Sequence, residues 1–173
     1  MVGNVLKSCQ FYGYAVIQIL IEPRRFFTEL PNNTTGVKSL GFCMICSIFF
    51  AMANLFTGNY PSPVKMGSIF FFSSVGMVFI SAGLSYMIMV MTIGKKSRFE
   101  VLFGVYAFSS GMVLLVSWMS FFLWFTEPWK WWLVYTGLKN TSRLAFKPAV
   151  LILLLTIMVQ FLLLYSLYLA FLK

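Results

Sequence analysis

The chain has 173 residues, of which 60% are hydrophobic, 19% are aromatic and only 10% are charged, with a formal net charge of +9. A mean hydropathy of +0.88 lies outside the range of soluble globular domains, so the composition predicts an integral membrane protein and excludes a soluble module. We expect an all-α transmembrane bundle over residues 37–173, preceded by an amphipathic interfacial segment, residues 1–36, in the cytoplasm.

The first predicted element is the apolar but interrupted segment 5–30. It has no small-residue cleavage site and its arginines follow the apolar run, so it does not resemble a signal peptide. One interpretation is one or two interfacial helices hinged at Pro23, with Arg24 and Arg25 on anionic headgroups. The apolar side chains that then enter lipid are Phe26, Phe27 and Leu30. The other interpretation is a helix that covers the bundle.

Three apolar runs are long enough to cross about 30 Å of hydrocarbon as helices. The first covers residues 40–56 and ends at the proline-containing turn 57–63. The second covers residues 66–93 and ends at the basic loop 94–100, and the last covers residues 148–172. Each run therefore predicts a transmembrane helix.

The segment between the basic loop and the last run, residues 101–138, is too long for one membrane helix and long enough for two. Residues 126–128, Thr-Glu-Pro, indicate the turn, with threonine as the N-cap and proline at the first helical position. The fourth helix, 128–138, is then short unless the turn lies earlier, near residues 117–120. We expect five transmembrane helices with the fourth compressed.

The positions of the cations favour five spans and a cytoplasmic N-terminus, because cytoplasmic flanks carry an excess of Lys and Arg. Four spans would place the basic loops 94–100 and 139–147 on opposite sides of the membrane. On the five-span topology the cytoplasmic cations are Lys7, Arg24, Arg25, Lys38, Lys95, Lys96, Arg98, Lys139, Arg143 and Lys147. We expect them to attract anionic phospholipids, whereas their spread over several flanks argues against nucleic acid as a partner.

The sequence contains no recognisable catalytic or metal-binding constellation. It has no histidine and only four acidic residues, all at or outside the ends of the predicted spans, so we expect no enzyme and no cofactor. Cys43 and Cys46 form a C-x-x-C inside the first span, where we interpret them as packing residues. Gln160 in the last span predicts a hydrogen bond to another helix or a contact with a substrate, and Asn54 is a candidate of the same kind.

Several short motifs follow one another from about residue 20 to the end of the chain. They are Pro23 with Phe26 and Phe27, GKKSRFEVL at 94–102 leading to YAFSS at 106–110, Trp131 or Trp132 with Leu133, GLK at 137–139, and the last apolar run. In order and spacing these motifs resemble the Yip domain of the Ypt/Rab-interacting membrane proteins. One departure is Gly111, because the family usually has a proline soon after the two serines. Glycine permits a bend there but does not force one.

The resemblance implies a five-helix bundle with a cytoplasmic N-terminus and no enzymatic activity. Eukaryotic members are linked to Rab-type GTPases and vesicle traffic and usually have a longer cytosolic N-terminal region. The chain therefore looks more like the short bacterial members, some of which are thought to assist the assembly of membrane transport complexes. We expect a non-enzymatic accessory or scaffold subunit of a larger membrane complex in the bacterial inner membrane; the endoplasmic reticulum or Golgi membrane is the alternative location.

Two other functions stay open at this point. One is a membrane-shaping protein that acts through residues 5–30, and the other is a small transporter or lipid-handling protein. The cavity of the latter would be lined by Asn54, Ser109, Ser110 and Gln160. The residues expected to bind a partner or lipid are Arg24, Arg25, Lys95, Lys96, Arg98, Phe99, Glu100, Ser109, Ser110, Gly111 and Gln160. In this hypothesis the basic loop anchors at the cytoplasmic face and positions a bendable span; an ordinary topogenic loop is the simpler interpretation.

Overall fold

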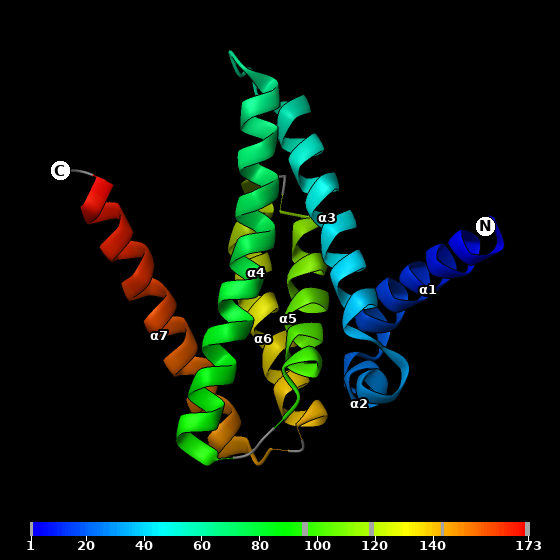
Figure 1. Cartoon of the computed structure of the whole chain (residues 1–173), viewed down its shortest axis with the longest axis vertical. Coiled ribbons are helices and arrows are strands. Elements are labelled where there is room, and N and C mark those ends of the chain that lie inside the picture. The colour runs from blue at the N-terminus through cyan, green and yellow to red at the C-terminus, as the bar shows by residue number, and fades with distance from the viewer. Residues whose placement is uncertain (1, 95–96, 118–119, 143, 172–173) are drawn as a thin grey trace.

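The computed structural model describes residues 2–94, 97–117, 120–142 and 144–171, and within these ranges the only regular elements are helices. Their bounds are α1 Val2–Ile21, α2 Pro23–Asn33, α3 Gly36–Thr57, α4 Pro63–Ile93, α5 Phe99–Leu114, the 3₁₀ helix η1 Ser120–Phe122, α6 Leu123–Thr141 and α7 Phe146–Phe171. In Figure 1, α3, α4, α5 and α6 form an upright bundle, while α1 and α7 diverge from it on opposite sides. The prediction of an all-α bundle is confirmed.

Three of the described helices are long and apolar enough to cross a membrane. They are α3, α4 and the 146–166 part of α7, which correspond to the three apolar runs of the sequence. The helix α4 begins at Pro63, where the missing amide donor is harmless. It ends at Gly94, whose positive φ of 64° is a backbone conformation that glycine adopts without strain.

The centre of the bundle is α5, which packs against α2, α3, α4 and α6. From Leu102 to Val113 every residue except Ser110 is buried, because these four helices surround α5. The ring of Phe108 stacks on Phe42 of α3 with centroids 4.7 Å apart. With 16 residues, α5 is only about 24 Å long, which makes it shorter than α6.

The predicted turn at residues 126–128 is wrong. The helix α6 begins at Leu123 and has 19 residues, so Pro128 lies inside it and the fourth helix is not the compressed one. Proline at this position removes only the hydrogen bond to the carbonyl of Trp124, in the first turn of α6, where the Trp124 side chain is exposed. The alternative of an earlier turn is confirmed, because α5 ends at Leu114 and η1 precedes α6.

The second helix, α2, covers the bundle instead of lying in lipid. The side chains of Phe26, Phe27 and Leu30 are buried, so the expectation that they enter lipid is wrong. They face α5 and α6, where the Phe26 and Phe108 ring centroids are 5.0 Å apart and Thr141 Oγ1 donates a hydrogen bond to the Phe27 carbonyl at 2.7 Å. The apolar stripe of α2 thus finds a complementary protein surface.

The two arginines of α2 lie on its exposed side. Arg25 hydrogen-bonds to Glu29 at 3.1 Å and to Glu22 at 3.5 Å. The hydrogen bond to Glu29, and then the one to Glu22, raise the pKa of Arg25 above its ordinary value. Because all three side chains are about half exposed or more, the pairs leave Arg24 and Arg25 accessible at the surface.

Candidate functional site: a polar cavity in the bundle

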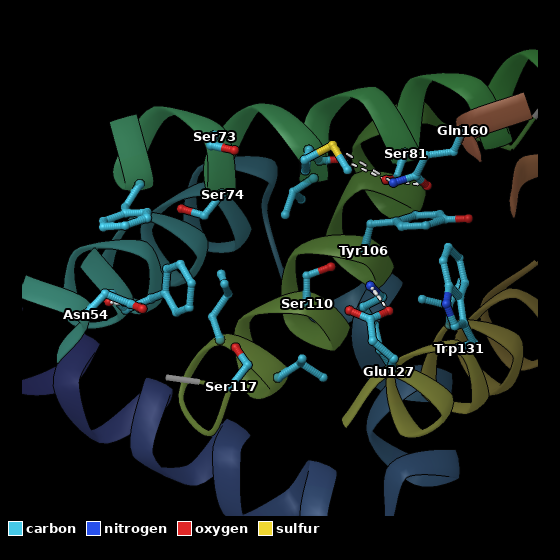
Figure 2. Close-up of a pocket in the computed structure, with 18 residues that line it drawn as sticks. Asn54, Ser73, Ser74, Ser81, Tyr106, Ser110, Ser117, Glu127, Trp131 and Gln160 are labelled. Carbon is cyan, nitrogen blue, oxygen red and sulfur yellow. Dashed lines mark hydrogen bonds and ion pairs between the residues drawn. The ribbon is translucent and has the colours of Figure 1, made fainter. Parts of the chain in front are cut away.

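A cavity of about 450 Å³ lies among α3, α4, α5, α6 and α7 (Figure 2). Its volume falls within the range of small-molecule sites. Neutral polar side chains line it: Asn54 of α3, Ser73, Ser74 and Ser81 of α4, Tyr106 and Ser110 of α5, Ser117 just after α5, and Gln160 of α7. They come from the half of the bundle that contains the α3–α4 turn, away from the α4–α5 loop (Figure 1).

Helical spacing explains how three of the helices each present a lining face. Residues at i, i+3, i+4 and i+7 lie on one side of a helix. The lining residues with this spacing are Ser74, Met77, Val78 and Ser81 on α4; Ser110, Val113 and Leu114 on α5, followed by Ser117 in the turn after it; and Glu127, Lys130, Trp131 and Val134 on α6. Each face contains apolar residues, which pack in the bundle, and one or two polar residues at its ends. Polar groups therefore collect where the faces meet.

The charged residues of the cavity are Glu127 and Lys130 of α6. Lys130 Nζ donates to Glu127 Oε2 at 2.6 Å and lies 4.9 Å from the ring centroid of Trp131, which is cation–π distance. The Lys130 side chain is 20% exposed and that of Glu127 is 51% exposed. Because α6 begins at Leu123, Glu127 lies inside this helix and not before its start as the predicted turn would have placed it.

Gln160 connects the last helix to α4. Ser81 Oγ donates to Gln160 Oε1 at 3.2 Å, and Gln160 Nε2 lies 4.0 Å from Met77 Sδ. Ser81 Oγ also lies 2.7 Å from the Met77 carbonyl, and since a hydroxyl has one proton, the two acceptors compete for it. The predicted bond from Gln160 to another helix is confirmed, and the same side chain also lines the cavity.

The other residues predicted to line a cavity divide into two groups. Asn54 lines it but donates to the Phe50 carbonyl of its own helix at 2.8 Å, so the expected bond to another helix is wrong. Ser110 lines the cavity as predicted. Ser109 does not, because neighbouring residues on a helix point about 100° apart, and it is fully buried elsewhere in the bundle.

The described residues of the basic loop lie at the other end of the bundle from the cavity (Figure 1). Lys95 and Lys96 are outside the described residues. Arg98 precedes α5, and Phe99 packs edge-on against Tyr86 with centroids 5.7 Å apart. Glu100 is in the first turn of α5, where its negative charge interacts favourably with the helix dipole. The structure therefore separates the predicted loop residues from Ser110 and Gln160.

Gly111 and the two cysteines belong to the packing between α3 and α5. A Cβ atom on Gly111 would lie 2.5 Å from Phe42 Cε1 and 3.2 Å from Cys46 Sγ. Cys43 and Cys46 are both buried, and the described residues contain no group of three His, Cys, Asp or Glu side chains that could hold a metal ion. This part of the bundle is apolar and closely packed.

Comparison with known families gives one extensive match. A family model for the Yip1 domain matches residues 17–167, a range that contains α2 to α6 and every residue that lines the cavity. No curated protein and no solved structure matched the chain. The match covers most of the sequence and agrees with the apolar helices of an integral membrane protein. The chain therefore belongs to the Yip1 domain family.

Proposed function

We propose that this protein binds a lipid by its headgroup inside the bundle and acts as a lipid-handling membrane protein. The observation that carries the proposal is the cavity of about 450 Å³, whose neutral polar groups and ion pair face a common space among apolar helices. Polar and ionisable groups inside membrane helices are costly and mark functional sites by default. The Yip1 family is associated with membrane trafficking and is generally not enzymatic, which is consistent with binding.

The chemistry of the walls suits an amphipathic ligand. Among the residues that the structure describes, Ser73, Ser110 and Ser117 make no side-chain hydrogen bond, so their hydroxyls are free to bond a ligand. The rings of Phe50 and Phe70 also line the cavity, 6.3 Å apart and edge-to-face. A molecule with a polar group and an apolar stem would satisfy both parts of this surface.

The cavity also has access to the surroundings of the bundle. Glu127 and Ser73 line it and are both exposed. Beyond Gln160, α7 moves away from α4 and α6 (Figure 1), and Phe161 and Leu162 are exposed. A lipid could therefore place its headgroup in the cavity while its acyl chains stay in the bilayer.

The test is to measure how much phospholipid copurifies with the protein in a mild detergent. Ser110→Phe should fill the cavity and reduce the bound lipid several-fold, whereas Ser68→Phe, on an exposed face of α4 outside the cavity, should not. Far-ultraviolet circular dichroism and gel filtration check that both variants are folded. Equal lipid content in the two folded variants would contradict the proposal.

A second candidate function is the accessory or scaffold subunit, which the exposed C-terminal half of α7 favours. Exposed apolar side chains in this half are Phe161, Leu162, Leu164, Tyr165, Tyr168 and Leu169. Gentle solubilisation of the native membrane followed by mass spectrometry tests it. A larger complex recovered at constant stoichiometry, and lost when Phe161 and Leu164 are changed to alanine, would support the subunit; recovery of the protein alone would contradict it.

For the topology we propose that α3 to α7 all cross the bilayer, with the N-terminus in the cytoplasm and the protein in the bacterial inner membrane. This orientation is supported because most of the described cations lie at the end of the bundle that carries the α4–α5 and α6–α7 connections (Figure 1), whereas Lys65 lies at the other end and Lys130 lines the cavity. These include Arg24, Arg25, Lys38, Arg98, Lys139 and Lys147. An excess of Lys and Arg marks the cytoplasmic side.

A further inference from the structure

We infer that the ligand of the cavity is zwitterionic: a headgroup that carries both a phosphate and an ammonium group, as in phosphatidylethanolamine. This inference rests on the function proposed above and names the class of lipid. It starts from Glu127 and Lys130, which form an ion pair on the cavity wall (Figure 2).

The lining of the cavity has no net charge. Glu127 and Lys130 are the charged groups among the described residues that line the cavity, so the lining carries one negative and one positive charge. An anionic headgroup that bound Lys130 would compete with Glu127 for the lysine and place two negative charges beside one positive charge, which is unfavourable. A zwitterion supplies a partner for each charge and keeps the cavity neutral. The balance of charge therefore selects against lipids with a net charge.

The two charged side chains lie at different depths. The side chain of Lys130 is the more buried of the two and sits against Trp131, while Glu127 is more exposed. Consequently a phosphate would bind Lys130 inside the cavity, with Ser110 as a neutral donor on α5. The ammonium group would then remain near Glu127 at the more open side. Charge-assisted hydrogen bonds of this kind are stronger than those between neutral groups.

The Glu127–Lys130 pair differs in its surroundings from an ordinary helical ion pair. Glu22, the N-cap residue of α2, and Arg25 have the same three-residue spacing, but both are exposed and lie outside the cavity. Such pairs contribute little to stability and bind nothing by themselves. Glu127 and Lys130 differ because they border the cavity together with Asn54, Gln160 and several serines. The α2 pair therefore provides a matched control.

The experiment uses the full-length protein in nanodiscs made of equimolar phosphatidylethanolamine and phosphatidylglycerol, with bound lipids identified by native mass spectrometry. We expect the wild type to retain phosphatidylethanolamine in preference to phosphatidylglycerol. Glu127→Gln leaves Lys130 without an acidic partner, so the ratio should shift toward phosphatidylglycerol by about tenfold or more. Glu22→Gln should leave the ratio unchanged. The double exchange Glu127→Lys with Lys130→Glu keeps the lining neutral but reverses the positions of the two charges, so phosphatidylethanolamine should still be preferred over phosphatidylglycerol while less of it is retained.

Different failures have different meanings. Suppose that Ser110→Phe abolishes lipid retention but the ratio of the two lipids is the same for the wild type and for Glu127→Gln. The inference of a zwitterionic headgroup is then wrong, while the proposed lipid binding is supported. If lipid retention does not depend on Ser110, both proposals are wrong. Displacement of phosphatidylethanolamine by millimolar soluble glycerophosphoethanolamine would show that the cavity binds a soluble compound and would contradict a lipid ligand. We expect no displacement, because the acyl chains of the lipid add apolar contact.

Discussion

At the scale of single residues, two glycines decide how closely the helices approach. A Cβ atom at Gly137 would lie 2.3 Å from Val105 Cγ1 and 3.3 Å from Phe27 Cδ1, and one at Gly111 would lie 2.5 Å from Phe42 Cε1. Small residues at such positions let helix backbones pack closely, which in a membrane replaces much of the hydrophobic driving force. These glycines hold α5 against α3 and α6 against α5 and α2.

Replacement of glycine by alanine should change stability differently at Gly137 and at Gly83. Gly137→Ala should destabilise the protein by about 1–3 kcal/mol, because Val105 cannot move far enough in a closely packed core. Gly83→Ala is the control, since nothing lies within 4 Å of a Cβ atom there, and it should be neutral or stabilising by up to about 1 kcal/mol. Unfolding midpoints in the same detergent measure both. Equal midpoints would show that the close approach at Gly137 is unimportant.

Gln160 leads to a second residue-scale prediction. Gln160→Leu removes the bond from Ser81, which keeps the Met77 carbonyl as an acceptor. The loss of stability should therefore be modest, about 0.6–1 kcal/mol, as for other interhelical hydrogen bonds in membranes. Met158→Leu, at an exposed position of the same helix, serves as the control. A loss of several kcal/mol would mean that Gln160 supports a larger network than the structure shows.

At the scale of helices, α2 shows how an amphipathic sequence can be mistaken for an interfacial one. Its polar residues and its apolar stripe suit a membrane surface and a protein surface equally well. What decides between them is the neighbour: α2 packs on the C-terminal half of α6, where the absence of a side chain at Gly137 leaves room for Phe27. Because Phe26, Phe27 and Leu30 are buried there, none of these three side chains is available for insertion into lipid.

Docking of α2 can be tested at Phe27, which is fully buried. Phe27→Ala should destabilise the folded protein by about 3–5 kcal/mol through the lost contacts and the cavity left behind. Thr28→Ala, one position along and exposed, should change stability by no more than about 0.5 kcal/mol. Thermal unfolding and limited proteolysis around residues 33–36 report the difference. If α2 were an independent lipid-surface helix, Phe27→Ala would weaken vesicle binding without changing the unfolding of the bundle.

At the scale of the whole molecule, the two ends of the bundle differ in charge and in structure. The end with the α4–α5 connection carries most of the described cations, and the other half contains the cavity. In the proposed orientation, with the cation-rich end in the cytoplasm, the cavity would lie toward the opposite leaflet. The proposed lipid would then enter from that leaflet.

The orientation predicts which positions a membrane-impermeant thiol reagent reaches in intact cells. In a variant whose native cysteines are replaced by alanine, Asn59→Cys in the α3–α4 turn should react from outside. Ala145→Cys, in the α6–α7 connection, should react only after the membrane is permeabilised. Both positions are exposed, so accessibility within the protein does not limit either reaction. The reverse pattern would invert the topology and place the cavity toward the cytoplasmic leaflet.

Much of the fold was predictable because it depends on local properties of the chain. Long apolar runs predict α3, α4 and α7 directly, and Pro63 and Gly94 mark the limits of α4. The start of α6 was not predictable from Pro128, because proline is tolerated both at the first position and one turn further in when the lost bond lies at the helix end. That error also concealed Glu127 and Lys130, although their spacing with Trp131 and Val134 already describes one face of a helix.

The sequence by itself determined that this is an all-helical membrane protein of the Yip1 domain family, because hydropathy and motif order are properties of the chain alone. It also indicated Gln160, since a buried amide needs a partner. Only the tertiary structure decided that Asn54, Ser110, Gln160 and the pair of α6 share one cavity, whereas Ser109 does not. A cavity forms where the faces of five helices meet, and their relative rotation follows from close packing at residues far apart in the sequence.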